Sequence, residues 1–225
     1  MKYLLNTLAL STLLAVAVSC NEDDENMVVN EKGQATFNMK SSNNSNNTSG
    51  RVMAGLEITS ATAAVSKVEI ESDNETETEV EFEGNYEVDL LTGTSNPEFG
   101  MAELAADTYN EIEIEFGTFL DNDASIIVEG NYINDKDEKI AFKYMLKKAL
   151  SIEIESDNGF EVTAGAVKNI VAEIDFALLF RDIDFELANA NADGLVIVDA
   201  SLNTYVYNLI NQNISAAFEV EVSED

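Results

Sequence analysis

The sequence contains no histidine and no tryptophan, a single proline, Pro97, and a single cysteine, Cys20. Without histidine the chain has no Ser-His-Asp or Cys-His nucleophile system, no histidine zinc site and no histidine pH switch. It also contains no Gly-x-Ser-x-Gly elbow and no glycine-rich nucleotide loop. These absences exclude the common hydrolase and nucleotide-binding designs. We therefore predict that the protein is not an enzyme and name no catalytic residue.

Basic residues are also scarce, because 12 Lys and Arg stand against 43 Asp and Glu and give a formal net charge of −31. A field of this sign repels phosphate backbones, so the composition excludes nucleic acid as a partner. Divalent cations, basic proteins and neutral glycans stay compatible with it. An acidic surface without any ligand, as an adaptation to a salty habitat, is the alternative.

The first twenty residues combine a positive start at Lys2, an apolar run from Leu4 to Val18 and small residues before Cys20. This pattern resembles a bacterial lipoprotein signal peptide, which is cleaved before a cysteine that then carries a diacylglycerol. The resemblance implies a leader at residues 1–19, lipidation at Cys20 and attachment to a membrane through that lipid. An ordinary secretory signal that contains a cysteine is the alternative. The apolar run, at about fifteen residues, is shorter than the roughly twenty that span a bilayer.

Residues 20–33 are expected to form an acidic flexible tether. Its segment Asn21–Asn26, NEDDEN, resembles the acidic export signal of surface lipoproteins of the Bacteroidota, which implies the outer membrane and its outer face. A solvated spacer without a signal function is the alternative, because clustered like charges repel. Residues 34–225 then suit a single domain of the sandwich type. With Cys20 acylated no thiol remains, so burial alone stabilises this domain.

Alternation of charged and apolar residues predicts strands along most of the domain. In Glu75–Glu83 a glutamate occupies every odd position, and the pattern recurs in Glu111–Phe116 and Ser151–Glu155. Successive side chains of a strand point to opposite faces, so each of these segments has one face of carboxylates and one apolar face. Directly opposed glutamates on adjacent strands destabilise pairing. We expect instead that lysines face an acidic row, namely Lys136, Lys139, Lys143, Lys147 and Lys148.

The expected fold class is mainly β, an antiparallel β-sandwich with one amphipathic C-terminal helix. The helix is expected at Asn203–Ala217, from its apolar residues at helical spacing. Turns are expected at Gly84-Asn85 and, in two hairpins, around Asn134–Asp137 and Ala164-Gly165. Residues 91–107 are expected to be mostly loop. Further strands are expected at 34–40, 56–59, 65–71, 86–90, 125–133, 139–146, 160–163, 170–176 and 218–222.

Four segments carry a resemblance to a known group of proteins. They are Gly33-x-Ala35-x-Phe37, Val88–Gly93 (VDLLTG), Leu104–Tyr109 (LAADTY) and Ala172–Phe176 (AEIDF). In this order they look like Bacteroidota lipoproteins built on a domain of unknown function, over most of residues 33–220. The resemblance implies a transthyretin-like or immunoglobulin-like sandwich and transfers no catalytic residue.

One segment predicts a metal site. Asn189, Asn191 and Asp193 precede Gly194 at the spacing of the first half of a calcium loop, and Asp199 follows. These four oxygen-bearing residues are the candidate calcium ligands. Ala200 stands at the twelfth position, where such a loop has an acidic ligand, and a plain Asp-Gly turn before a strand is the alternative. No other cofactor is expected.

Two functions from different classes fit these observations. The leading expectation is a surface-exposed lipoprotein of the outer membrane that acts as a non-catalytic binding or adhesion module for a glycan or a protein. The alternative is a structural subunit of a fimbria-like surface assembly, which exchanges a strand with its neighbour. The candidates for that strand are Gln34–Lys40 and the tail from Phe218.

Overall fold

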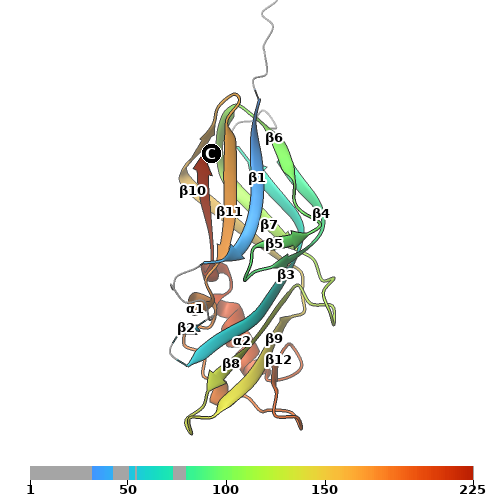
Figure 1. Cartoon of the computed structure of the whole chain (residues 1–225), viewed down its shortest axis with the longest axis vertical. Helices are drawn as coiled ribbons and strands as arrows, with labels where there is room; N and C mark the ends of the chain where they lie inside the picture. The colour runs from blue at the N-terminus through green and yellow to red at the C-terminus, as the bar shows by residue number, and fades with distance from the viewer. Residues whose placement is uncertain (1–31, 43–50, 54, 73–79, 225) are drawn as a thin grey trace, which may run out of the picture.

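The computed structural model describes residues 32–42, 51–53, 55–72 and 80–224 (Figure 1). The leader, Cys20, nearly all of the tether and the first part of the Glu75–Glu83 segment lie outside the described residues. Strands dominate the described part and form one sheet of four strands and one of nine. The mainly-β prediction is therefore confirmed.

The smaller sheet has the strand order β13-β11-β1-β6. It consists of β13 (Phe218–Glu224), β11 (Val167–Ile174), β1 (Lys32–Ser41) and β6 (Met101–Ala105). β6 pairs only with the first half of β1, from Lys32 to Thr36. The second half of β1 therefore pairs with β11 on one side only. Its other side lies near the segment that contains β5 (Thr94–Asn96).

The larger sheet is organised around one long strand, β3 (Leu56–Glu71). β8 (Ile126–Ile133) pairs with its first half and β7 (Asp107–Phe116) with its second half, while β4 (Val80–Asp89) lies on the opposite side. The other strands are β2 (Arg51–Met53), β5 (Thr94–Asn96), β9 (Lys139–Leu146), β10 (Leu150–Val162) and β12 (Val196–Val198).

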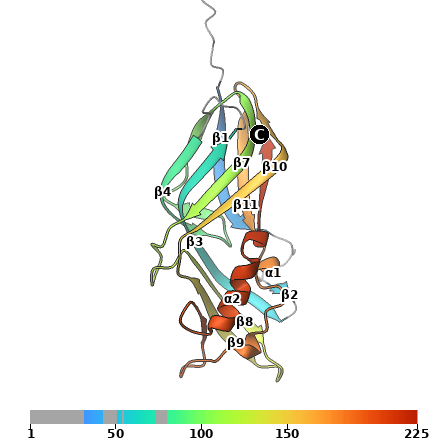
Figure 2. The same cartoon turned by 180° about the vertical axis from the view of Figure 1, so that it is seen from behind.

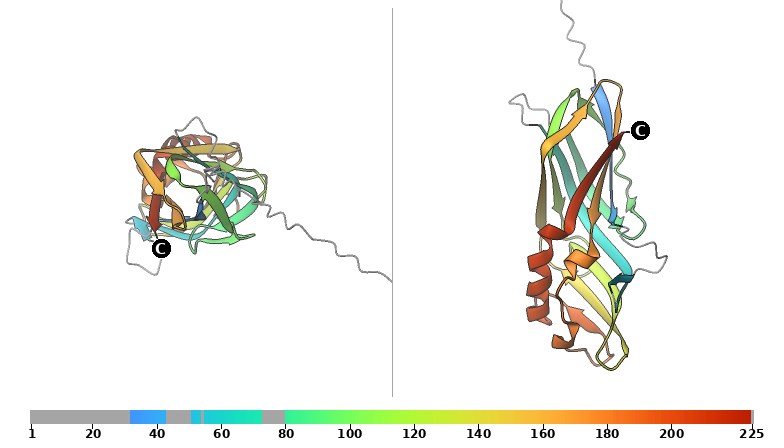
Figure 3. Two further views of the ribbon diagram at one scale, coloured as in Figure 1. Left: turned by 90° about the horizontal axis from the view of Figure 1, so that it is seen from above. Right: turned by 90° about the vertical axis from the view of Figure 1, so that its left-hand side faces the viewer.

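β3 joins two halves of the molecule, which are separated along the vertical axis of Figure 1. In the upper half, β4, β3, β7 and β10 pack against the smaller sheet, and Figure 3 shows strands of both sheets around a common interior. Rings from the two sheets meet there: Phe37 lies 6.3 Å from Phe82, and Phe116 lies 5.5 Å from Phe218, between ring centroids. The upper half is thus a sandwich with a continuous apolar core.

In the lower half, helical segments cover the sheet of β8, β9 and β12 (Figures 1 and 2). These are α1 (Phe176–Leu179), η1 (Phe185–Leu187), α2 (Thr204–Asn213) and η2 (Ser215–Ala217). Phe180, directly after α1, is fully buried. Its ring lies 5.6 Å from that of Phe142 and 6.0 Å from that of Phe185. Aromatic packing under the helices therefore forms the core of this half.

Most strand pairs are antiparallel, as predicted, but each sheet is mixed because it contains one parallel pair. β1 runs parallel to β11 and β12 runs parallel to β9. An alternating pattern fixes which residues face the core, but it carries no information on strand direction. Both parallel pairs join segments that are far apart in the sequence, so no hairpin constrains them to be antiparallel.

Three further predictions of local structure are corrected. Gly84-Asn85 forms no turn, because β4 runs through it without a break. Ala164-Gly165 turns no hairpin, because β10 pairs with β7 while β11 pairs with β1 in the other sheet. The segment 91–107 contains β5 and β6. The hairpin around Asn134–Asp137 is confirmed, since β8 and β9 pair along their whole lengths.

The predicted C-terminal helix is shorter than expected, since α2 ends at Asn213 and a 3-10 turn follows. It packs against α1 and the β12 segment in the lower half. In the part of the chain that the structure describes, no helix has the length and apolar character required to cross a membrane.

Candidate functional site

A groove lies on the outer face of the smaller sheet, where β6 ends and β1 continues. Its floor is formed by β1 and β11, and its wall by residues 93–100, a segment that includes β5 and lies beside β1 in Figure 1. Phe99 fixes that wall, because its ring stacks on Tyr86 at 4.2 Å and meets Phe37 edge-on at 4.8 Å. The hollow has a volume of about 580 Å³, within the roughly 300–1,000 Å³ of small-molecule sites.

Six of the thirteen residues that line this groove carry a neutral polar side chain, and four others, Phe37, Phe99, Ile170 and Val171, are apolar. The hydroxyl and amide groups come from Thr36, Asn38, Thr94, Ser95, Asn169 and Ser223. Glu98 is the one ionisable residue among the lining residues. Thr36 donates a hydrogen bond from Oγ1 to Asn169 Oδ1, so the two central strands hold their polar groups in a fixed relation. In a chain with 43 acidic residues, such a surface favours a neutral ligand rich in hydroxyl groups.

The predicted carboxylate faces lie side by side on the outer face of the upper half, on β10, β7, β3 and β4. One row joins Glu153, Glu113, Glu69 and Glu81 in direct register. We call this surface the glutamate face; its carboxylates are Glu69, Glu71, Glu81, Glu83, Glu111, Glu113, Glu115, Glu153 and Glu155. The sequence predicted the individual faces, and the structure adds that they are neighbours.

Two triplets on this face bring carboxylate oxygens within 4.8 Å of one another: Glu69 with Glu113 and Glu115, and Glu111 with Glu153 and Glu155. Such distances suit a divalent cation in geometry alone. In the first triplet, however, Glu69 is paired with Lys67, which also reaches Glu81 at 2.8 Å. The hydrogen bonds that Lys67 donates to Glu69 and Glu81 raise the pKa of Lys67 above its ordinary value. Lys67 therefore already supplies positive charge at this position.

The second triplet has no such lysine among the ion pairs of the described residues. Burial raises the pKa of Glu111, and repulsion from Glu153, Glu71, Glu155 and Glu113 raises it further. A raised carboxyl pKa means that the folded state holds the proton more tightly than the unfolded state. The charge on Glu111 consequently costs stability at neutral pH, and this cost disappears as the pH falls through the folded-state pKa.

Glu111→Gln is therefore expected to raise the free energy of unfolding at pH 7 and low salt by about 0.5 kcal/mol, the typical size of a cross-strand repulsion. The gain should shrink at high salt and vanish in acid. Urea unfolding of both proteins across pH and salt measures it. Glu221→Gln on β13, an exposed carboxylate outside the glutamate face, is the control and should change little. A loss of stability in Glu111→Gln at pH 7 contradicts the repulsion.

The expected position of the lysines is wrong. Lys139 pairs with Glu57 at 2.6 Å, Lys143 with Glu129 at 2.7 Å, and Lys147 with Asp199 at 2.7 Å. Glu57 and Glu129 lie on β3 and β8 in the lower half. The register of β9 with β8 and β3 places Lys139 and Lys143 beside Glu57 and Glu129, and Lys147, in the loop after β9, pairs with Asp199 after β12, so none of these three lysines pairs with the glutamate face.

The structure places the four candidate calcium ligands in a segment that runs from η1 to α2. Asn191 accepts hydrogen bonds on Oδ1 from the amides of Asp193 (2.9 Å) and Leu195 (3.0 Å), and the first of these is the pattern of an Asx turn. The amide of Asn189 donates to Asn203 Oδ1 at 2.8 Å. These bonds organise the turn by themselves. The groups of carboxylates that approach one another within metal-binding distance, among the described residues, do not include this segment.

Asp199 is buried, with 3% of its surface exposed. Its Oδ2 pairs with Lys147 Nζ at 2.7 Å, and its Oδ1 accepts from the amides of Ser201 and Leu202, both at 2.7 Å. Burial alone raises the pKa of a carboxyl, but here the hydrogen bonds from Lys147 and the two amides outweigh burial and lower the pKa. Asp199 thus ties β9 to the segment before α2. Calcium binding at these residues stays a prediction.

Sequence reasoning missed the groove, because its polar residues come from four strands and no spacing connects them. The signal that existed was weak: Thr36, Asn38 and Asn169 occupy outward positions of strands in which a chain this acidic usually places glutamate. Only the register of β1 with β11, which sets Thr36 opposite Asn169, brings them together.

Comparison with known proteins assigns the chain to a family. The chain matches no curated protein and no solved structure. Residues 54–190 match the family described as a domain of unknown function, DUF4382. This span includes the glutamate face and both β6 and β11, but it leaves out β1, β12, α2 and β13. Because the match covers more than half of the sequence, the chain belongs to the DUF4382 family.

Proposed function

We propose that the protein is a surface lipoprotein of the outer membrane in the Bacteroidota, held by a lipid on Cys20, and that its β domain is a non-catalytic binding module. The proposed ligand is a neutral glycan, and the proposed site is the groove on β1 and β11. The observation that carries this proposal is the lining of the groove, in which hydroxyl and amide groups replace the carboxylates found elsewhere.

The chemistry of the groove supports a glycan over an ion or a nucleotide. A sugar offers many hydroxyl groups that both donate and accept, and the side chains of Ser, Thr and Asn complement both roles. A single carboxylate, Glu98, suits a bidentate contact with two neighbouring hydroxyls, since it accepts on both oxygens. The groove offers no lysine or arginine for a phosphate or a sulfate.

The sequence supports the lipid anchor, and the position of β1 limits how far the domain can lie from the lipid. Lys32, the first residue of β1, follows Cys20 by twelve positions. A chain of this length spans at most about 40 Å when fully extended. A lipid on Cys20 would therefore keep the groove close to the membrane surface, where a module meets material of the cell envelope or of a neighbouring cell.

The non-catalytic part of the proposal rests on where the carboxylates are. General acid and base catalysis on a glycosidic bond needs two carboxyl groups on either side of the substrate. The groups of three carboxylates that approach one another within 4.8 Å, among the described residues, lie on the open glutamate face, whereas the groove has Glu98 alone. The groove is therefore suited to hold a glycan and not to cleave it.

Calorimetric titration of the full chain with neutral oligosaccharides tests the proposal. Asn38→Ala and Asn169→Ala should each weaken binding roughly fivefold, because a lost hydrogen bond costs about 1 kcal/mol net. Asn131→Ala, an amide on an outward position of β8, removes the same group outside the groove and should bind like the unchanged chain. A bound oligosaccharide should also raise the melting temperature, since ligand at a hundred times its Kd adds about 2.7 kcal/mol.

Two results would overturn the proposal. The first is that no neutral oligosaccharide binds or stabilises the chain. The second is that binding occurs and is equally tight in the two groove variants, which would place the site elsewhere. Release of reducing ends from a bound oligosaccharide would contradict the non-catalytic part alone.

A structural subunit of a surface assembly is the second candidate function. The observation that favours it is β13, an edge strand near the C-terminus that pairs with β11 alone among the described strands. β1, the other candidate for exchange, lies between β11 and β6, and its side chains Ala35, Phe37 and Met39 are buried. Sedimentation of the lipid-free chain as a monomer favours the binding module, whereas stable multimers favour the assembly.

A further inference from the structure

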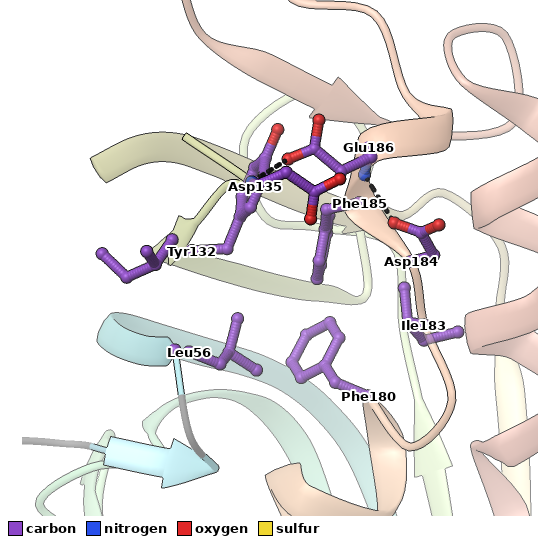
Figure 4. A pocket seen from close by; sticks show the side chains of 10 residues that line it. Leu56, Tyr132, Asp135, Phe180, Ile183, Asp184, Phe185 and Glu186 are labelled. Atoms are coloured by element: carbon purple, nitrogen blue, oxygen red, sulfur yellow. Dashed lines mark hydrogen bonds between the residues drawn. The ribbon is translucent and has the colours of Figure 1, made fainter. Parts of the chain in front are cut away.

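A second hollow lies in the lower half, where β3 begins and β8 ends (Figure 4). It has a volume of about 170 Å³ and is lined by the start of β3, the end of β8 and the segment from Phe180 to Glu186. Its deep part is apolar. Leu56, Phe180 and Phe185 are buried there, and the ring of Tyr132 stacks on that of Phe185 at 5.1 Å.

The rim of this hollow is acidic. Asp135, Asp184 and Glu186 contribute three exposed carboxylates, and no lysine or arginine is among the lining residues. Figure 4 shows Asp135 and Glu186 above the ring of Phe185 and Asp184 beside it, with Leu56 and Phe180 on the opposite side of the pocket. None of the three takes part in the ion pairs found among the described residues. The rim is thus a negative charge without an internal counterion.

Backbone hydrogen bonds hold the rim in place. Glu186 Oε1 accepts from the amide of Asp135 at 3.2 Å, which joins the β8–β9 turn to η1. Asp184 Oδ1 accepts from the amide of Glu186 at 2.9 Å and caps η1. Each bond uses one oxygen, so the carboxylates are oriented without being neutralised. Burial raises the pKa of the nearby Tyr132, and the negative charges of Glu186 and Asp184 raise it further.

An apolar floor under a carboxylate rim selects one chemistry. We propose that this pocket binds a protonated alkylamine, the chemistry of a lysine side chain, with its alkyl stem on Leu56 and the partly exposed Ile183 and its ammonium between the rim carboxylates. A primary ammonium is a compact charge with three donors, and the carboxylate oxygens of the rim can accept from them. The long apolar stem of such a group gains from burial while its charged head stays at the rim.

The same geometry disfavours other ligands. The three rim carboxylates do not form one of the groups whose oxygens lie within 4.8 Å of one another, so they are not arranged around a bare metal ion. An anion is repelled by the rim. A neutral sugar would leave the charge of the rim without a counterion. The pocket is independent of the proposed glycan groove, since the two share no lining residue.

Titration of the full chain with n-butylammonium, followed by the amide resonances of Asp135 and Glu186, tests the proposal. We expect saturable shifts of both resonances, and we expect butan-1-ol, which has the same stem without the charge, to bind at least tenfold more weakly. The double variant Asp184→Asn and Glu186→Gln keeps the shape of the rim and should weaken butylammonium binding at least tenfold. Glu221→Gln removes one exposed carboxylate on β13 and should leave it unchanged.

Two sources of the amine are separated by a second titration. Nα-acetyl-lysine amide should bind like butylammonium, and its Nε-acetylated form, which lacks the charge, should not bind; this result supports a lysine of a partner protein as the occupant. Binding of butylammonium without binding of the lysine derivative supports a free amine. Equal binding of butylammonium and butan-1-ol, shifts that do not saturate, or equal losses in the double variant and in Glu221→Gln would each overturn the proposal.

Discussion

Phe180→Ala is expected to lower the free energy of unfolding by about 4 kcal/mol, since removal of a buried phenylalanine leaves a cavity and typically costs 3–5 kcal/mol. Phe180 has no exposed surface, and its ring contacts those of Phe142, Tyr144, Phe176 and Phe185. Four aromatic neighbours cannot all move into the space that it vacates. At this chain length the loss corresponds to a fall in melting temperature of roughly 10 °C, which calorimetry measures directly.

Two variants control this expectation. Phe119→Ala removes the same ring from a loop residue that is 38% exposed, and it should cost less than about 1 kcal/mol. Phe180→Leu keeps most of the volume and should cost less than about 1.5 kcal/mol. Equal losses in Phe180→Ala and Phe119→Ala would mean that the helical segments of the lower half do not pack on its sheet as described.

The sequence predicted the faces of the strands better than it predicted their neighbours. Glu111–Phe116 and Ser151–Glu155 alternate strictly, and both form strands with their apolar residues inward, β7 and β10. The alternation of apolar and charged residues predicts which side chains of a strand are buried, and it does so without reference to the neighbouring strands. Pairing depends on which strands lie side by side, and the alternating pattern is the same for every possible neighbour. For this reason the parallel pairs and the in-register glutamates of β7 and β10 were not predicted.

Gly84 shows a second limit of reading the sequence. Gly84-Asn85 is a common turn signal, but here it lies inside β4, near the point where the pairing of β3 with β4 shifts register between Val65 and Lys67. A glycine in a strand interior also marks irregular pairing. A glycine in a turn and a glycine inside a strand differ in whether the chain reverses or continues in the same direction after it. That direction depends on the tertiary structure.

The lysines of the β8–β9 hairpin were assigned to the wrong carboxylates for a related reason. Lys139 and Lys143 alternate on β9, so their side chains point to one face of the sheet. The register of β9 with β8 and of β8 with β3 then determines the partners, Glu129 and Glu57. A one-residue change of register would move both lysines to the other face, and composition contains no information on register.

Asp199→Asn is expected to lower the free energy of unfolding at pH 7 by about 3 kcal/mol, because removal of one partner of a buried ion pair leaves the other without compensation. The amide keeps an oxygen for the backbone amides of Ser201 and Leu202, so the loss comes mainly from the pair with Lys147. The pKa of Asp199 is lowered in the folded state. Its contribution is therefore present above the unfolded-state pKa, about 3.9, and is lost as the pH falls through the folded-state pKa.

Urea unfolding of both proteins between neutral and acid pH measures this difference, which should shrink in acid. Lys147→Met removes the other partner, and the double variant should cost less than the sum of the two single variants, because the second change breaks no further pair. Asp193→Asn changes an exposed carboxylate in the neighbouring turn and should cost less than about 0.5 kcal/mol. All four measurements are made with calcium and with a chelator. If Asp199 acts through Lys147, the loss is the same in both conditions; a loss seen only with calcium would instead make Asp199 a ligand, together with Asp193.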